Sequence, residues 1–364
     1  MSRSRQQLLK LRARDFRNLR ELELSPGPRF NVIAGDNGQG KSNLLEAIDY
    51  LGTLRSFRGA SAEELVRDEA PQAELFATTG GEVLPHEHRV RLARTGARRE
   101  VQLDGKRPRS RVDYAQTFPV VVFQPGDLSL TTGAPEPRRA FLDQVLERLD
   151  VTYATSLAAY TKALASRNRL LKAERPQLRA ITAYDELLAS AGAVIGQSRA
   201  ALVEALAPRV THSFAEISGE GPGISVAYES KVAPSVEALR NALAETLEKD
   251  LARGFTGVGP HGDELQVRLQ EHKARRYASQ GQHRAIVLAL KVAELLELEK
   301  RTGRTPLLLL DDVSSELDSG RNRRFFGLLA DLGGQVFLTT TQPALILAEG
   351  EREDFRMQAG VISR

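Results

Sequence analysis

The stretch that decides the fold is Gly35-Asp36-Asn37-Gly38-Gln39-Gly40-Lys41-Ser42, which fits the pattern G-x-x-x-x-G-K-[ST]. It follows an apolar run, residues 30–34, and leads into residues 43–50, whose apolar side chains have helical spacing. A strand, a glycine-rich turn and a helix in this order form the context in which the pattern binds phosphates. The sequence therefore predicts a nucleoside-triphosphate site, and the alternative is a glycine-rich turn that binds nothing.

Each part of this stretch has an expected role in holding phosphates. The glycines allow backbone N–H groups to point at phosphate oxygens, and the following helix adds the partial positive charge of its N-terminus. We expect Lys41 to neutralise the β- and γ-phosphates and the Ser42 hydroxyl to bind Mg²⁺. The predicted cofactors are thus a nucleoside triphosphate and Mg²⁺.

Composition narrows the class of protein. The 364 residues are enough for about two or three domains, and 41% of them are hydrophobic, as in proteins with a substantial core. The sequence has no cysteine, which excludes disulfides and thiolate metal sites. No apolar run approaches the roughly 18 residues of a membrane span, and the N-terminus lacks the apolar core of a signal peptide. We therefore expect a cytoplasmic protein without membrane partners.

Positive charge is concentrated in one region of predicted strands, residues 75–111. The net charge is only +4, and arginine codons are also favoured by G·C-rich genomes, so charge alone decides nothing. Two interpretations stay open for this region: a basic surface that faces DNA, or the solvated face of a sheet. The arginines in question are Arg89, Arg91, Arg94, Arg98, Arg99, Arg107, Arg109 and Arg111. His86 and His88 lie nearby without a third metal ligand, and we interpret them as surface residues.

Polar side chains follow two other predicted core strands. Gln124 comes directly after the apolar run 120–123, and Asp311 and Asp312 end the run 307–310. Because the carboxyl ends of parallel strands meet at one edge of a sheet, Gln124 and Asp311 are candidate Mg²⁺ ligands beside Ser42. A further strand, 335–338, ends in three threonines.

A second candidate phosphate contact lies at the start of an apolar helix that runs to residue 298. Ser279 and Gly281 precede this helix, and such residues are typical of a helix N-terminus that binds anions.

Earlier in the chain, residues 137–216 have helical periodicity interrupted at Pro176, which predicts two long helices forming an antiparallel arm. His261 and Asp263 lie in a tight loop and fit turn chemistry better than a catalytic pair.

The order of these parts resembles the ATP-binding-cassette (ABC) ATPases, and within them the RecF recombination-mediator family, related to the heads of Rad50 and the chromosome-maintenance (SMC) ATPases. The narrower match rests on a set of short strings spread over nearly the whole chain. They are residues 56–58 (SFR), 138–143 (RRAFLD), 167–168 (RN), 259–261 (GPH) and 310–318 (LDDVSSELD). The resemblance implies an α/β fold: an ABC-type P-loop ATPase head with mixed sheets and an inserted α-helical arm. We expect residues 1–135 and 256–364 to form the head and 136–255 the arm.

This sequence departs from the family pattern at several positions. Ala278 and Gln280 replace the Leu and Gly that most cassette proteins carry in the signature, while Ser279, Gly281 and Gln282 remain. The loop after His261 reads Gly-Asp-Glu, where the family usually has Arg and two acids. Asp312 replaces the glutamate of transporter cassettes, and a threonine replaces their strand-end histidine. We assign that last position to Thr341.

The resemblance also implies a mechanism. In cassette ATPases the signature of one subunit completes the phosphate site of the other, so ATP joins a head-to-head dimer. Here Ser279, Gly281 and Gln282 would be the signature contacts, and Asp318 would lie at the dimer seam. Asp312 would polarise the attacking water, with Lys41 and Thr341 assisting. Since Asp is one methylene shorter than Glu, we expect slow hydrolysis.

The partners implied by the resemblance are double-stranded DNA and single-strand/double-strand junctions, bound without sequence preference and in a salt-dependent way. RecR, with RecO and RecA, would act in the same repair of gaps and stalled forks. The competing interpretations are the ATPase subunit of a membrane transporter, a Rad50-type nuclease regulator and a P-loop kinase. The first has a shorter helical insert, the second needs a long coiled coil, and the third needs neither signature nor Asp318.

Overall fold

The computed structural model describes residues 4–96, 99–221, 223–313, 318–348 and 350–364. The chain divides into two compact units. The first unit contains residues 1–128, 209–223 and 278–364, and the second contains 129–208 and 224–277. The predicted boundaries at 135 and 255 stay a prediction, and they differ from these units chiefly over 209–223 and 256–277.

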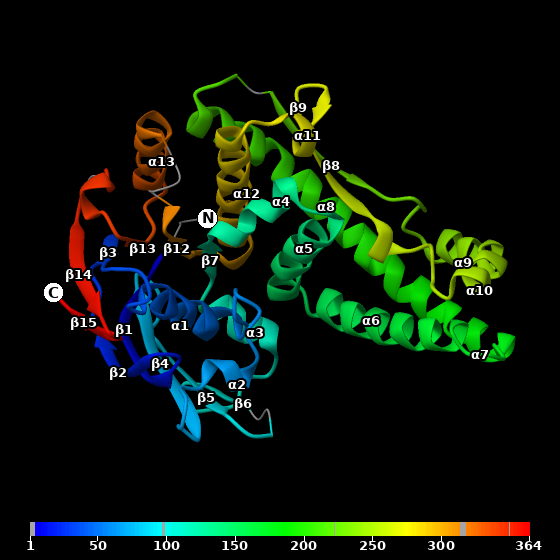
Figure 1. Cartoon of the computed structure of the whole chain (residues 1–364), viewed down its shortest axis with the longest axis horizontal. Helices are drawn as coiled ribbons and strands as arrows, with labels where there is room; N and C mark the ends of the chain where they lie inside the picture. Colours follow the sequence, from blue (N-terminus) through cyan, green and yellow to red (C-terminus); the bar gives the residue numbers. More distant parts are fainter. Residues whose placement is uncertain (1–3, 97–98, 222, 314–317, 349) are drawn as a thin grey trace. The chain divides into compact units, whose positions relative to one another are not determined.

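A mainly parallel sheet forms the centre of the first unit (Figure 1). All neighbouring strands in it are parallel except the last pair, β14 and β15. Because both faces of such a sheet are covered, its strands are continuous apolar runs, as β12 illustrates. The strand order is β15 (Val361–Ser363), β14 (Arg352–Gln358), β3 (Phe30–Ala34), β13 (Val336–Thr340), β12 (Leu307–Asp311) and β7 (Val120–Phe123).

Helices and a second sheet complete this unit. The helices are α1 (Lys41–Thr53), α2 (Ala62–Leu65), α3 (Arg111–Thr117), α12 (Gln280–Thr302) and α13 (Ser319–Leu332). The second sheet has the order β11 (Arg304–Thr305), β1 (Ser4–Phe16), β4 (Gln72–Gly81), β5 (His86–Ala93) and β6 (Arg99–Leu103), with β2 (Leu19–Leu24) paired to β1. Buried leucines from β1, α1, β4 and β12 share one core, so α1 is packed between the two sheets. The predicted mixed-sheet α/β head is confirmed.

The second unit is mainly helical, as expected for the arm. Its helices are α4 (Ser129–Thr132), α5 (Pro135–Leu149), α6 (Val151–Leu171), α7 (Leu178–Thr182), the first part of α8 (Asp185–Ser218), α9 (Val236–Glu245), α10 (Leu247–Arg253) and α11 (Ala274–Tyr277). A small sheet has the order β10 (His272–Lys273), β9 (Glu264–Leu269) and β8 (Ile224–Glu229). A short 3₁₀ turn in this unit is Pro260–Gly262, and the first unit has two more, Pro125–Leu128 and Pro343–Leu345.

The predicted break at Pro176 lies between α6 and α7. A further break occurs at Asp150, whose carboxylate accepts the backbone N–H groups of Thr152 and Tyr153 and so caps α6. In contrast, α8 continues through Pro208 to Ser218. None of the helices in the described part of the chain is long and apolar enough to cross a bilayer.

A fully buried arginine holds the helices of the second unit together. The Arg167 guanidinium donates to Asp185 (2.9 Å) and to Asp250 (2.8 Å), and it also donates to the Thr256 hydroxyl (2.8 Å). Burial raises the pKa of Asp185, and the charge of Arg167 opposes that rise. Removing the arginine would leave two carboxylates without their cation in a site that water hardly reaches.

We therefore expect Arg167→Ala to lower the free energy of unfolding of this unit by about 3–5 kcal/mol. Arg169→Ala is the matched control, because Arg169 is exposed two residues further along the same helix. The control should change stability by no more than about 0.5 kcal/mol. Chemical denaturation followed by circular dichroism measures both changes, and equal effects would contradict a stabilising role for the cluster.

Candidate nucleotide-binding site

The predicted phosphate loop joins β3 to α1, as the sequence indicated. Gly40 precedes the helix with φ of 108°, a left-handed conformation that favours glycine. A side chain there would also collide with Asn18, because a Cβ atom would lie 2.7 Å from the Asn18 Oδ1 atom. Gly40 has no side chain that could cap α1. The first backbone N–H groups of the helix therefore receive no hydrogen bond acceptor from the N-cap residue. This is the geometry of an anion-binding helix N-terminus.

Lys41 lies inside the curve of the loop. Its Nζ atom donates to the carbonyl oxygens of Gly35 (2.6 Å) and Asp36 (2.8 Å). Burial lowers the pKa of Lys41, while Asp312, Asp311 and Asp36 act in the opposite direction. The ammonium group is therefore held where the loop would enclose phosphate oxygens.

Ser42 and Asp311 come together at the carboxyl edge of the sheet. The Ser42 hydroxyl donates to Asp311 Oδ1 (2.7 Å), and the Thr339 hydroxyl donates to the same oxygen (2.8 Å). These are hard oxygen donors, the type that Mg²⁺ prefers. Their chemistry fits a magnesium ion between the phosphate loop and β12.

The other candidate residues of this edge follow from the strand register. Phe123 pairs with Leu310, so Gln124 follows β7 at the position beside Asp311; its side-chain amide donates to the Phe57 carbonyl (3.0 Å). Asp312 has φ of 53°, and its N–H donates to the Thr339 hydroxyl (3.1 Å). A non-glycine residue in this conformation costs about 1–3 kcal/mol and is typical of functional sites. Asp312 thus leaves the line of the strand at the point where a catalytic carboxylate is expected.

The threonine assignment depends on which residue reaches this edge. Thr339 contacts both Asp311 and Asp312, as given above. Thr341 lies just past the end of β13 and is exposed. The assignment of Thr341 as a catalytic residue stays a prediction, and Thr339 is the threonine that the structure brings to Asp311.

The signature residues form a second cluster within the same unit. Ser279 caps α12, and a capping box links its side chain and backbone to those of Gln282. The Gln282 amide donates to Glu220 (3.0 Å), and Glu220 pairs with Arg321 (3.2 Å). Arg321 in turn pairs with Asp318 (3.0 Å), which caps α13. Ser279, Gln282 and Asp318 are therefore joined to one another through Glu220 and Arg321. Residues 314–317, which carry part of the string 310–318, lie outside the described residues.

Gly281 allows close packing in this cluster. A Cβ atom at Gly281 would lie 2.3 Å from a terminal nitrogen of Arg321. Since Arg321 joins Glu220 to Asp318, a larger residue at position 281 would have to displace that guanidinium.

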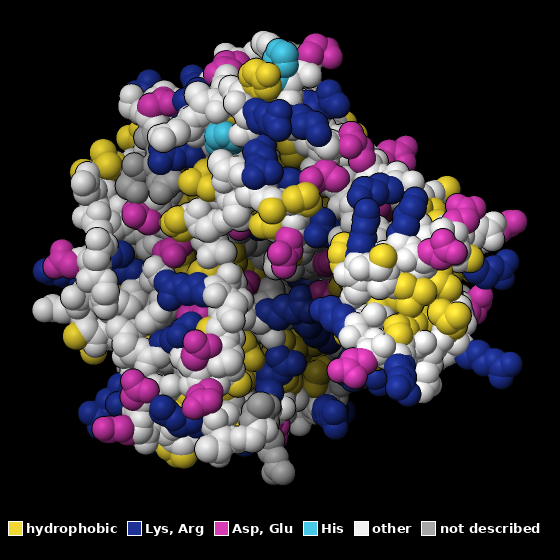
Figure 2. All heavy atoms as spheres, turned by 45° about the vertical axis from the view of Figure 1, so that its right-hand side comes forward, with side chains coloured by type: hydrophobic (Ala, Val, Ile, Leu, Met, Phe, Trp, Pro, Cys, Tyr) yellow, Lys and Arg dark blue, Asp and Glu magenta, His cyan; other side chains and the backbone are white. Residues whose placement is uncertain are grey.

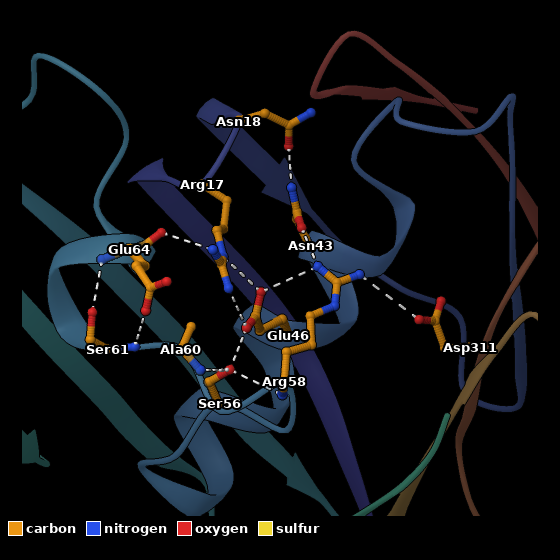
Figure 3. Close-up of polar contacts among 10 residues, drawn as sticks. All are labelled: Arg17, Asn18, Asn43, Glu46, Ser56, Arg58, Ala60, Ser61, Glu64 and Asp311. Atoms are coloured by element: carbon orange, nitrogen blue, oxygen red, sulfur yellow. Dashed lines mark hydrogen bonds and ion pairs between the residues drawn. The ribbon is translucent and has the colours of Figure 1, made fainter. Parts of the chain in front are cut away.

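A buried carboxylate behind the phosphate loop was missed by the sequence analysis (Figure 3). Glu46 of α1 is fully buried and accepts two hydrogen bonds from Arg17, both of 3.0 Å, and one from the Ser56 hydroxyl. Arg58 lies 3.6 Å from Glu46 and 4.0 Å from the Asp311 carboxylate. Its guanidinium also donates to Asn43 (2.8 Å). The string 56–58 thus places the positive charge of Arg58 beside the expected magnesium ligand. The one sequence signal for this role is Glu46, an acid at a position of α1 where the helical spacing predicts burial.

Turns from both ends of the chain contact the phosphate loop. The backbone oxygen of Gln39 accepts the Gly360 N–H (2.8 Å), and its side-chain oxygen accepts the Ala359 N–H (2.6 Å). Both donors lie in the turn between β14 and β15. On the other side, Asn18 of the β1–β2 turn lies against Gly40 and accepts a hydrogen bond from Asn43 in the first turn of α1 (2.8 Å). The loop is therefore held in shape by elements far from it in sequence.

His88 and His261 take no part in the described contacts of this site. His88 is buried rather than at the surface, and its Nε2 atom lies 3.1 Å from the Thr79 hydroxyl. Burial lowers the pKa of His88 to about 3. His261 bonds to Tyr160 and to the Thr256 carbonyl, whereas Asp263 accepts the Tyr228 hydroxyl. Within the described residues, no cluster of His, Asp or Glu forms a metal site of the three-ligand type.

Comparison with known proteins identifies the family. The model of the RecF/RecN/SMC N-terminal domain matches residues 7–360. A protein of Anaeromyxobacter sp. (strain Fw109-5) described as "DNA replication and repair protein RecF" is 44% identical over 98% of each chain. The chain belongs to the RecF family. A second RecF, from Myxococcus xanthus, is 42% identical over 93% of this chain and 92% of its own length.

Solved structures agree with this assignment. A structure described as the recombination mediator protein RecF-ATPrS in the RecFOR pathway has a TM-score of 0.90 and 32% sequence identity. The match covers 100% of this chain and 99% of that chain. The Smc head domain of Pyrococcus furiosus, at 19% identity, has a TM-score of 0.57 over 98% of this chain and 95% of that chain. The predicted head fold is therefore shared by this RecF-family chain and the SMC heads.

Proposed function

We propose that this RecF-family protein is an ATP-dependent DNA-binding protein of recombinational repair and replication-fork maintenance, with slow, DNA-stimulated ATP hydrolysis. The observation that carries the proposal is the convergence of Lys41, Ser42 and Asp311 at one edge of the central sheet. Membership of the RecF family favours a repair ATPase over the transporter and kinase alternatives.

ATP and Mg²⁺ are the proposed cofactors. The loop residues 35–42 would surround the phosphates, and Ser42, Asp311 and Gln124 would hold the metal. Mg²⁺, when bound, would neutralise charge on the β- and γ-phosphates. Asp312 would orient the attacking water, and Arg58 lies close enough to Asp311 to add positive charge beside it.

A two-fold dimer would complete each site. Ser279, Gln282 and Asp318 are linked to one another through Glu220 and Arg321. None of these residues is among the described contacts of the phosphate loop. That separation supports a composite site in which the signature of one subunit faces the phosphates held by the other. Nucleotide would then stabilise the dimer by mass action.

The proposed partners are duplex DNA and its junctions with single strands, contacted through phosphates. RecR is the proposed protein partner, with RecO and RecA acting in the same pathway to cover single-strand gaps. The support is the family assignment together with the RecF described above as a mediator in the RecFOR pathway.

A mixing experiment tests the composite site. Lys41→Ala removes the phosphate contact and Ser279→Arg blocks the signature, so each variant alone should lose ATPase activity. Neither variant should pair with itself in ATP, whereas a mixed dimer keeps one intact site of two. The mixture should therefore regain activity, up to about half of the wild-type rate. A folded but inactive mixture would contradict composite sites.

The concentration dependence gives an independent check. The wild-type rate should rise more steeply than linearly with protein concentration, and linear duplex DNA should strengthen the rise. A strictly linear rate that ignores DNA would mean that each monomer hydrolyses ATP alone.

A further inference from the structure

Figure 2 shows one face of the molecule, on which Lys and Arg side chains lie among Asp and Glu side chains. A mixed surface of this kind, with a net charge of only +4, does not by itself mark a binding site for a polyanion. The arginines of β5, β6 and the segment that follows them need to be sorted by their partners.

Several of these arginines are engaged with acids. Arg89 pairs with Glu74 (3.4 Å), and Arg94 pairs with Asp68 (3.2 Å). Arg91 lies 3.3 Å from Glu74 and 3.6 Å from Glu100. Their charge is largely matched locally, as expected for the solvated face of a sheet. Arg98 lies outside the described residues.

Arg91 and the remaining arginines line a groove in the first unit with a volume of about 910 Å³. It lies between the ends of β5 and β6 and the segment that leads into α3. The described residues that line it include five arginines and a single acid, Glu100. The arginines are Arg91, Arg99, Arg107, Arg109 and Arg111.

Arg107 and Arg109 are the free charges of this groove. Both side chains are exposed, and neither forms an ion pair with the residues that the structure describes. They follow the tight turn at Asp104 and Gly105, which have φ of 51° and 73° and reverse the chain after β6. Both residues line the groove, where each guanidinium group can make paired contacts with phosphate oxygens.

We propose that this groove binds the sugar-phosphate backbone of duplex DNA; the inference rests on the proposed DNA-binding function and assigns the contact to named residues. The described lining contains no aromatic side chain. Proteins that hold single strands stack bases on aromatic rings, so a groove of arginines without rings fits the backbone of a duplex. The contact is then independent of sequence.

The groove also lies at the C-terminal end of the phosphate-loop helix. Arg99 donates to the carbonyl of Leu54 (2.6 Å), and Arg111 donates to the carbonyl of Thr53 (3.2 Å). These carbonyls end α1 and carry the partial negative charge of the helix terminus. Lys41 begins the same helix about 20 Å away, from the rise per residue. A DNA phosphate in the groove competes for the guanidinium groups that hold α1, which gives DNA a physical route to the nucleotide site.

The test is the double variant Arg107→Glu/Arg109→Glu, compared with Arg20→Glu/Arg323→Glu. The control residues are exposed, belong to the same unit, are absent from the groove lining and undergo the same change in charge. Binding of a labelled linear duplex is measured by fluorescence anisotropy over a series of salt concentrations. The groove variant should lose about tenfold in affinity for each phosphate contact, and its salt slope should fall by about 2.

Two further readouts separate this contact from general damage. ATP binding without DNA should be the same in the groove variant as in the wild type. DNA stimulation of the ATPase should be lost at DNA concentrations that saturate the wild type. Duplex binding should fall more than single-strand binding, whereas a fall confined to single strands would overturn the duplex assignment.

The outcomes distinguish this inference from the function on which it rests. A wild-type protein that fails to bind duplex DNA would overturn both. A wild type that binds, with a groove variant of unchanged affinity and salt slope, would overturn the groove alone. Equal losses in the groove variant and the control would show that net charge governs binding, which also overturns the groove.

Discussion

Replacing Lys41 with alanine is expected to abolish ATP-dependent dimerisation. Lys41 is a buried residue, 8% exposed, and its ammonium group lies within hydrogen-bond distance of two loop carbonyls, so its charge is directed at whatever the loop encloses. Two charge-assisted hydrogen bonds to phosphate contribute about 3 kcal/mol, which corresponds to a loss of ATP affinity of about a hundredfold. Calorimetric titration with ATP measures the affinity, and sedimentation velocity with and without ATP measures the dimer.

Lys300→Ala is the matched control for this change. Lys300 is exposed in the last turn of α12, at the far end of that helix from the signature. It should bind ATP and dimerise as the wild type does. A Lys41→Ala protein that still dimerised with ATP at wild-type concentrations would refute the proposed use of nucleotide as the link between subunits.

The second large effect is expected from Asp312→Asn. A carboxylate that orients or deprotonates water contributes about 10²- to 10⁴-fold to rate, so hydrolysis should fall by that factor. The substitution suits this position, because Asn tolerates the left-handed backbone that Asp312 adopts with φ of 53°. ATP binding should survive, and the ATP-bound dimer should therefore persist longer than that of the wild type.

Single-turnover hydrolysis and the rate of dimer dissociation after ATP is diluted are the measurements. Asp312→Glu extends the same charge by one methylene and tests whether the short side chain slows the reaction. An Asp312→Asn variant with wild-type turnover would show that another residue orients the attacking water. A variant that no longer binds ATP would show that Asp312 has a structural role instead.

The parts of the site that are local in sequence were predictable. The phosphate loop, the apolar strands and the capping of α12 by Ser279 each depend on a few neighbouring residues and on one periodicity. The meeting of Ser42 with Asp311 was predictable as well, because parallel strands bring their carboxyl ends to one edge. Helix breaks were less accessible: Asp150 acts as a cap that no proline or glycine marks, and Pro208 is accommodated inside α8.

The parts that depend on tertiary contacts could not be predicted. Arg17, Glu46 and Arg58 come from a turn, a helix and a loop, and only packing brings them together. The same limit applies to the threonines at the end of β13, since strand register decides which of them faces Asp311. The limit also applies to the arginines within residues 89–111. The sequence does not distinguish them, because only the folded structure shows which of them form ion pairs with acids.

The turn between β14 and β15 bears on how the protein is made. It donates two backbone hydrogen bonds to Gln39, and β14 supplies a neighbouring strand to β3. During synthesis the ribosome releases residues 35–42 long before residues 352–363. We expect a nascent chain to lack these supports of the phosphate loop until the hairpin of β14 and β15 emerges and folds. We therefore expect nucleotide binding, and any pairing of subunits that depends on it, to begin only after residues 352–363 have been translated.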